Sequence, residues 1–167
     1  MKNRKMENHT EIVHLIEQHR RLIYKVVNSY CSDVHEQEDL IQEIIFQLIK
    51  GYEKFDHQVK VTTWMYKVAF NVSISHYRKL KSRQKYVVAM PDKLVSVEED
   101  EEPDIDENLK RLRELIDELD PLNKAIFIMY LDDNSHAEIS EAMGISVSNV
   151  GTKINRIKKQ LKKKFNQ

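Results

Sequence analysis

The sequence predicts an all-α protein: two small helical domains joined by a flexible acidic linker, the C-terminal one a helix-turn-helix. Apolar residues recur at helical rather than alternating spacing through most of the 167 residues, which include only three glycines. Periodicity is lost between about residues 86 and 106, where the run "VEEDEEPDIDE" is typical of a solvated linker. We therefore expect domains at 1–88 and 107–167, joined by 89–106.

The first domain is expected to contain three helices. The first covers residues 10–31. Ser32-Asp33 then offers a cap for a second helix over 34–50, which Gly51 should end, and a third helix covers about 62–81. The predicted core residues are Ile12, Leu15, Ile16, Leu22, Ile23, Val26, Val27, Leu40, Ile41, Ile44, Ile45, Leu48, Ile49, Met65, Val68, Ala69 and Val72.

The second domain is expected to begin with a helix at residue 107. A second helix starts at Pro121, behind the cap residue Asp120, and the segment Asp132-Asp133-Asn134 closes it. Its predicted core residues, with those of the final helix, are Leu109, Leu112, Leu115, Ile116, Leu119, Leu122, Ala125, Ile126, Ile128, Met129, Leu131, Val150, Ile154, Ile157 and Leu161.

The run "SHAEISEAMGISVSNVGTKI" predicts a helix-turn-helix near the C-terminus. Ser135 and Glu138 match a capping box, because serine at the cap and glutamate three residues later satisfy free amides reciprocally. Gly144 supplies the left-handed residue that ends the short helix, and Ser146 can cap the next one.

Charge is sorted along the chain although the formal net charge is zero. No acid lies between Asp56 and Asp92, and seven bases do. Residues 92–120 hold thirteen acids and four bases, whereas 142–167 hold seven bases and no acid. Such blocks can be ordinary solvated surface. Two basic blocks, each on a helical pattern, favour a polyanionic partner.

The composition also predicts a cytoplasmic protein without membrane insertion. Residues 1–8 are polar and basic, unlike a signal peptide, and no apolar run approaches the roughly 20 residues that span a bilayer. The lone Cys31 excludes an internal disulfide and fits a reducing compartment.

The final helix has the pattern of a DNA recognition helix. Opposite its apolar stripe, hydrogen-bonding side chains come first, where a helix meets base edges, and lysines follow, where it meets phosphates. The alternative is an ordinary helical hairpin. The candidate residues are Asn149, Thr152, Lys153, Asn155, Arg156, Lys159 and Lys163.

Two further faces are candidates for binding. In the third helix an aromatic ring, an amide and cations share one face, as in surfaces that bind single-stranded nucleic acid. The alternative is that Trp64 fills the core, and the two roles can coexist. In the second helix Phe46 interrupts a polar face, either as an incidental exposed residue or as the anchor of a protein contact. The residues of these faces are Trp64, Lys67, Asn71, Ser75 and Arg78, and Asp39, Gln42, Glu43, Phe46 and Lys50.

These stretches resemble a known family. "EDLIQEIIFQLIKGYEKF" followed by "TTWMYKVAFNVSISHYRK" resembles the promoter-melting domain (region 2) of the sigma-70 family. "IDELDPLNKAIFIMYLDDNSHAEISEAMGISVSNVGTKINRIKKQL" resembles its C-terminal promoter-binding domain (region 4). The likeness covers about residues 10–88 and 107–165. Having only these two domains on a short linker, the chain resembles an extracytoplasmic-function (ECF) sigma factor.

The resemblance implies a role for each face. The segment 39–43, with Phe46, matches the motif that docks on the clamp helices of the polymerase β′ subunit. The segment 63–71 matches the family motif in which the loop before the tryptophan and the helix itself hold the melted, flipped base of the −10 element. Thr152, Asn155 and Arg156 match positions that face the −35 element. The implied partners are core RNA polymerase (β′ clamp helices and β subunit), promoter DNA and an anti-sigma factor. No cofactor, metal or catalysis is implied.

The sequence departs from the family pattern at a few positions. His136 stands where tyrosine is frequent, Ser140 where alanine is usual, and Gly151 replaces a lysine or arginine. The loop 56–61 also lacks the usual Phe-Arg-Gly pattern. The −35 sequence and the −10 base preference therefore cannot be copied from other members.

Two other classes of protein compete with this interpretation. A helix-turn-helix regulator acting without core polymerase would need a receiver or dimerisation domain, and residues 10–88 lack the alternating strand and helix pattern of a receiver. An enzyme would need a catalytic motif. The seven histidines show no paired spacing such as His-Glu-x-x-His, and no glycine-rich phosphate loop is present.

Overall fold

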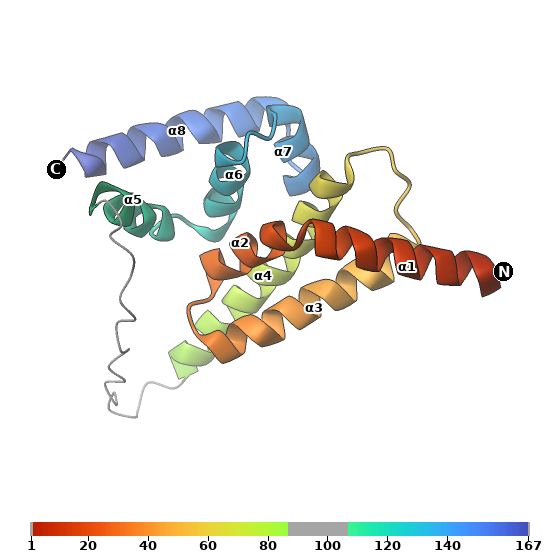
Figure 1. The fold of residues 1–167 in the computed structure, drawn as a ribbon. Helices are drawn as coiled ribbons and strands as arrows, with labels where there is room; N and C mark the ends of the chain where they lie inside the picture. Colours follow the sequence, from red (N-terminus) through yellow and green to blue (C-terminus); the bar gives the residue numbers. More distant parts are fainter. Residues whose placement is uncertain (1, 87–106, 167) are drawn as a thin grey trace.

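The computed structural model describes residues 2–86 and 107–166, and there it confirms the all-α prediction. These residues form eight helices and no strand (Figure 1). The helices are α1 (Lys2–Gln18), α2 (Arg20–Tyr30), α3 (Val34–Tyr52), α4 (Val61–Tyr86), α5 (Glu107–Asp117), α6 (Pro121–Leu131), α7 (His136–Met143) and α8 (Val147–Phe165). The predicted linker, 89–106, lies outside the described residues.

The N-terminal body consists of α1 to α4. The single helix expected over residues 10–31 is wrong: the chain forms two helices that meet at His19, whose backbone (φ −106°, ψ 18°) is not helical. This break lets the two parts pack differently, since α1 packs against α3 whereas α2 packs against both α3 and α4. The apolar stripes meet as predicted, with Val26, Val27, Ile44 and Ala69 fully buried.

Gly51 does not end α3, contrary to the prediction. The helix continues to Tyr52, and a Cβ atom at position 51 would lie 3.3 Å from Cζ2 of Trp64. The glycine therefore lets the indole ring lie close to the α3 backbone. The start of α3 is as expected, because the Asp33 carboxylate accepts a hydrogen bond from the Glu36 amide at 3.0 Å.

The C-terminal body consists of α5 to α8, and its helix-turn-helix matches the sequence prediction closely. The Ser135 and Glu138 capping box is present, and Gly144 is left-handed (φ 67°). Ser146 caps α8 by accepting from the Asn149 amide at 3.2 Å. Leu119, Phe127, Ile157 and Leu161 form a small core between α5, α6 and α8.

Two predicted core residues of this body are exposed instead. Leu109 and Leu131 are each 54% exposed. Leu109 lies in the first turn of α5, a helix with no buried residue of its own, and Leu131 is the last residue of α6. Helical periodicity places a residue on a face but does not show how far along the helix its partners extend.

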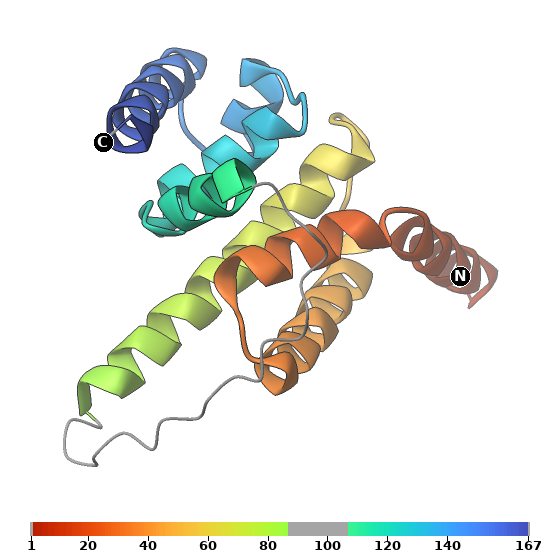
Figure 2. The same ribbon diagram turned by 60° about the vertical axis from the view of Figure 1, so that its left-hand side comes forward.

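The two bodies pack directly against each other. α4 contacts α7 extensively and α6 more briefly, and Figures 1 and 2 show both of these helices beside its N-terminal half. One continuous core cluster includes Ala69 and Phe70 of α4 together with Met129 of α6 and Ile139 of α7. The tethered, separate domains expected from the sequence are therefore docked in this structure.

The glycines of the helix-turn-helix give opposite predictions for replacement by alanine. Gly151 lies inside α8 without positive φ, and a Cβ there would make only ordinary contacts, 3.6 Å from the His136 ring. We expect Gly151→Ala to stabilise the protein by about 0.5–1 kcal/mol. Gly144→Ala should destabilise it by about 1–2 kcal/mol, because alanine is strained at positive φ. Urea denaturation measures both, and destabilisation by Gly151→Ala would contradict this account.

Candidate nucleic-acid interface

The predicted recognition face of α8 is open to solvent in the structure. Its capped N-terminus lies at Ser146, and four buried side chains hold the opposite face against the rest of the body. Thr152 donates its hydroxyl to the Ser148 carbonyl at 3.1 Å, so its oxygen remains as an acceptor. The exposed residues of the face are Asn149, Thr152, Asn155, Arg156, Lys159 and Lys163.

Three other cations of α8 are already bonded within the domain. Lys153, which we expected to bind DNA, is half-buried and donates to the Asn123 side-chain oxygen at 3.2 Å, apart from the exposed residues of the face. Lys158 lies over the Tyr130 ring, with its nitrogen 4.2 Å from the ring centroid, and Lys164 pairs with Glu118. By contrast, no acidic partner of Arg156, Lys159 or Lys163 appears among the described residues. These three cations are available to an external anion.

On α4 the structure leaves most of the predicted face open, including Lys67, and covers only part of Trp64. Asn71, Ser75 and Arg78 are exposed. Trp64 is half-buried: its ring stacks on Phe55 at a centroid distance of 4.9 Å and leans over Gly51. Part of the Trp64 ring is therefore buried, as the alternative interpretation expected, and part of it is exposed.

The loop before α4 adds an aromatic residue that sequence reasoning assigned to no site. His57 is exposed, has positive φ (58°), and lies 4.5 Å from the Phe55 ring between centroids. An aromatic cluster thus forms beside this loop, with the rings of Tyr52, Phe55, His57 and Trp64. A non-glycine residue at positive φ is uncommon, although histidine is among the more tolerant types, and the sequence carries no signal for it.

The predicted protein-contact face of α3 is fully exposed. Asp39, Gln42, Glu43 and Phe46 lie on it, and the Phe46 ring is 56% exposed. The Lys50 ammonium lies 5.9 Å from the ring centroid, and the Glu43 carboxylate accepts from Gln47 at 2.8 Å. A large aromatic side chain is thus presented to solvent on a polar helix face.

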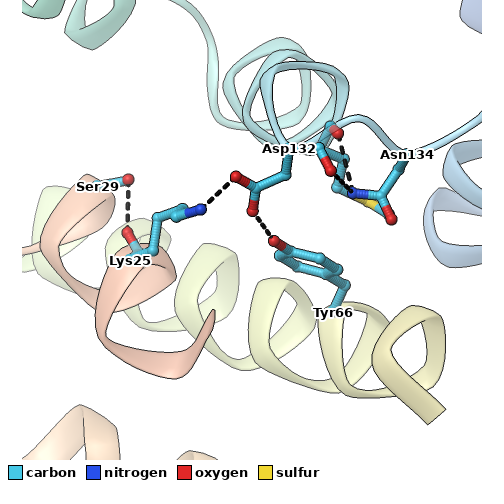
Figure 3. Close-up of polar contacts among 6 residues, drawn as sticks. Lys25, Ser29, Tyr66, Asp132 and Asn134 are labelled. Carbon is cyan, nitrogen blue, oxygen red and sulfur yellow. Dashed lines mark hydrogen bonds and ion pairs between the residues drawn. The ribbon is translucent and has the colours of Figure 1, made fainter. Parts of the chain in front are cut away.

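Asp132, at the C-terminal cap of α6, joins the two bodies (Figure 3). One carboxylate oxygen accepts from the Lys25 ammonium of α2 and the other from the Tyr66 hydroxyl of α4. Tyr66 is 4% exposed, and burial, together with the Asp132 carboxylate, raises the pKa of its hydroxyl. The contact therefore joins a neutral phenol and an ammonium to one carboxylate.

Two more hydrogen bonds cross the same boundary. The Tyr30 hydroxyl donates to the Pro121 carbonyl at 2.5 Å, and the Lys124 ammonium donates to the Ser29 carbonyl at 3.0 Å. Burial, and after it the Asp120 carboxylate, raises the pKa of the Tyr30 hydroxyl. Hydrogen bonds thus cross this boundary beside the shared apolar core.

Ion pairs link α4 and the residue before it to α7. The Lys60 ammonium lies 2.6 Å from a Glu138 carboxylate oxygen, and Lys67 lies 3.9 Å from Glu141. The Lys60 ammonium, followed by the Ser135 amide, lowers the pKa of the Glu138 carboxyl from 4.5 to about 2. What this shift contributes to stability is fully present above pH 4.5 and is lost as the pH falls toward 2.

Comparison with known proteins identifies the family. The family model described as sigma-70 region 2 matches residues 15–83, and that of sigma-70 region 4 matches 109–161. The ECF RNA polymerase sigma factor SigM of Bacillus subtilis is 30% identical over 149 residues, covering 87% of this chain and 89% of that protein. The ECF sigma factor SigW of the same organism is 26% identical over 163 residues, covering 90% and 87%.

Solved structures show the same fold. The sigma factor RpoE in a co-crystal structure with the anti-sigma factor NepR from Bartonella quintana has a TM-score of 0.72 at 14% identity, over 92% of this chain and 95% of that one. CnrH, solved in complex with the cytosolic domain of CnrY, has a TM-score of 0.68 at 14% identity, over 97% and 94%. The chain belongs to the ECF group of the sigma-70 family of RNA polymerase sigma factors.

The comparisons favour the sigma factor over the helix-turn-helix regulator that acts alone. Among the described residues, no cluster of three or more histidine, cysteine, aspartate or glutamate side chains could hold a metal ion. No helix in 2–86 or 107–166 is long and apolar enough to cross a membrane.

Proposed function

We propose that this chain binds core RNA polymerase in the cytoplasm, directs it to promoters and contributes no catalysis of its own. Residues 1–88 would bind polymerase and the melted −10 element, residues 107–167 the −35 element, and 89–106 would join them. The observation that carries this proposal is the pairing, in one chain, of an exposed recognition face on α8 with the aromatic and cationic face of α4.

For the −35 element we propose that α8 enters the major groove. Asn149, Thr152, Asn155 and Arg156 belong to its first half, where side chains reach base edges, whereas Lys159 lies further along, toward phosphate. Lys153, held by Asn123, would support α8 rather than contact DNA. Duplex binding of this kind supplies anchoring energy before melting begins.

For the −10 element we propose that the aromatic cluster and the cations of α4 hold an unpaired base and its strand. Trp64 offers a half-exposed ring, Asn71 an amide, and Lys67 and Arg78 positive charge. Stacking of a base on an aromatic ring contributes about 1–3 kcal/mol, which can offset the few kcal/mol needed to unstack it. The loop residue His57 extends the same cluster.

The polymerase contact is proposed at the exposed face of α3, with Asp39, Gln42, Glu43 and Phe46. For regulation we propose an anti-sigma partner, since the two structural relatives named above were solved in complexes, one of them explicitly with an anti-sigma factor. The overall proposal is tested by run-off transcription with core polymerase on a pool of genomic promoters. Transcripts with discrete starts that require this chain support it, and their absence overturns it.

Replacing Phe46 should weaken polymerase binding without harming the fold. Because its ring is exposed and packs on no core residue, Phe46→Ala should lower the affinity for core polymerase at least about tenfold, as for an aromatic hot spot. The melting temperature should change by no more than a few degrees. Val34→Ala is the matched control, because Val34 is 63% exposed on another face of α3. A large fall in melting temperature with unchanged affinity would contradict the assignment.

Replacing Trp64 should impair promoter opening more than initial binding. We expect Trp64→Ala to reduce the permanganate reactivity of melted thymines on duplex promoter, and to do so much less on a template with a pre-made bubble. The physical reason is that the bubble removes the unstacking cost that the ring offsets. Equal loss on both templates would mean that Trp64 acts only through its packing on Phe55 and Gly51.

Arg156 and Lys163 of α8 should contact different parts of the DNA, the first a base and the second a phosphate. The planar fork of Arg156 can bond guanine O6 and N7 together, so Arg156→Ala should cost about 1–3 kcal/mol and relax preference at one or two −35 base pairs. Lys163→Ala should weaken binding to all sequences similarly and reduce the slope of log affinity against log salt by about one. Fluorescence anisotropy of holoenzyme on −35 duplexes, with base variants and a salt series, measures both. If Arg156→Ala alters only the salt slope, Arg156 contacts phosphate instead.

A further inference from the structure

One position beside the recognition face of α8 has no side chain to offer DNA. Gly151 follows Ser148 by three residues and precedes Asn155 by four, so the three lie on the same side of the helix. Ser148 and Asn155 are both polar and exposed. Gly151 stands where the family pattern has a lysine or arginine, so α8 carries no cation at this point.

The ring of His136, the first residue of α7, lies over this glycine. A Cβ atom at position 151 would lie 3.6 Å from both Nδ1 and Cε1 of the imidazole. Because position 151 has no side chain, the imidazole can lie directly against the backbone of α8. His136 is nevertheless exposed, so its ring belongs to the surface beside the recognition face.

The His136 side chain is not engaged elsewhere in the protein. Across residues 2–86 and 107–166 the histidine that forms an ion pair is His76, and the His136 ring makes no hydrogen bond there. Its contact with the glycine involves the Nδ1–Cε1 edge, which leaves Nε2 unused. The nearest acid in the sequence, Glu138, accepts from the Ser135 amide and pairs with Lys60. An imidazole, which carries an N–H donor in either protonation state, is thus presented to solvent.

The turn between α7 and α8 holds the ring in this place. Ser140, one helical turn after His136, donates its hydroxyl to the Ile145 carbonyl at 2.5 Å. The Ser140 carbonyl accepts from the Gly144 amide at 2.9 Å and from the Ile145 amide at 3.3 Å. Serine stands here where alanine is usual in the family, so the hydroxyl bond is an addition in this chain. These bonds fix α7 relative to α8 and keep the imidazole over Gly151.

We propose that His136 supplies, from α7, a DNA phosphate contact that α8 lacks at position 151. This inference rests on the proposed function, because it concerns the same −35 site. In helix-turn-helix complexes the second helix enters the major groove while the first crosses the DNA backbone, so a donor at the start of α7 faces a phosphate. The positive end of the α7 dipole lies at the same point and favours an anion. His136 therefore positions α8 on the duplex and does not read its sequence.

A methylphosphonate scan of a −35 duplex tests this contact. Each duplex, from a promoter identified by run-off transcription, carries one neutral methylphosphonate in place of a phosphate, and fluorescence anisotropy measures the binding of holoenzyme. We expect His136→Ala to weaken binding to the unmodified duplex about fivefold or more, because a hydrogen bond to a charged group is lost. At one or two adjacent positions the methylphosphonate should weaken the wild type by the same factor and leave the variant unchanged.

Two further variants sharpen the test. His136→Ala combined with Gly151→Lys should recover most of the lost affinity, because it returns a cation to α8 beside the same phosphate. The matched control is His14→Ala, which removes an exposed histidine from α1 and should change the affinity less than twofold. All three proteins keep Ser135 and Glu138, so the capping box of α7 is intact.

Two results would overturn the inference. Loss by the same factor on every duplex of the scan would show that His136 acts only through its packing on Gly151. Unchanged binding by His136→Ala would show that the ring does not touch DNA. The proposed function is tested separately in the same assay, because it requires wild-type holoenzyme to bind the −35 duplex more tightly than a duplex of scrambled sequence.

Discussion

The packing of α7 against the N-terminal half of α4 is the contact on which the arrangement of the whole chain depends. It merges the cores of two helical bodies into one, and it leaves Asp132 where Lys25 and Tyr66 can both reach its carboxylate. α4 contributes Ala69 and Phe70 to this shared core, whereas Asn71, Ser75 and Arg78 of its proposed −10 face are exposed. In the proposed function the two bodies bind two separate promoter elements, so we expect them to move apart in the promoter complex.

Much of the fold could be predicted because its determinants are local. The capping box of Ser135 and Glu138, the left-handed Gly144 and the stripe Val150, Ile154, Ile157 and Leu161 each depend on residues within a few turns, and the structure confirms them. The prediction that Gly51 ends a helix was wrong, because the glycine instead makes room for the Trp64 ring of the next helix. The break at His19 likewise depends on what α1 and α2 pack against, which periodicity does not encode.

The site was predictable to the same extent. Exposure of Phe46, Asn71 and Arg156 follows from their place opposite an apolar stripe. The half-buried Lys153 was not predictable, since its partner Asn123 lies thirty residues earlier. Asp132 bonds Tyr66, which is 66 positions away in the sequence, and Lys25, which is 107 positions away. No short sequence pattern predicts these two contacts. The sequence thus predicts which helix faces are exposed, but not that the N-terminal and C-terminal bodies pack against each other.

A pair of spin labels tests the central claim most directly. After Cys31→Ser, labels placed at Glu38 on α3 and Gln160 on α8, both exposed, report the distance between the two bodies. Pulsed dipolar spectroscopy of the free chain should give one narrow distribution at the separation seen in this structure. With core polymerase and promoter DNA the distance should lengthen by tens of ångströms. A broad distribution in the free chain, or the same distance in both states, would contradict the account.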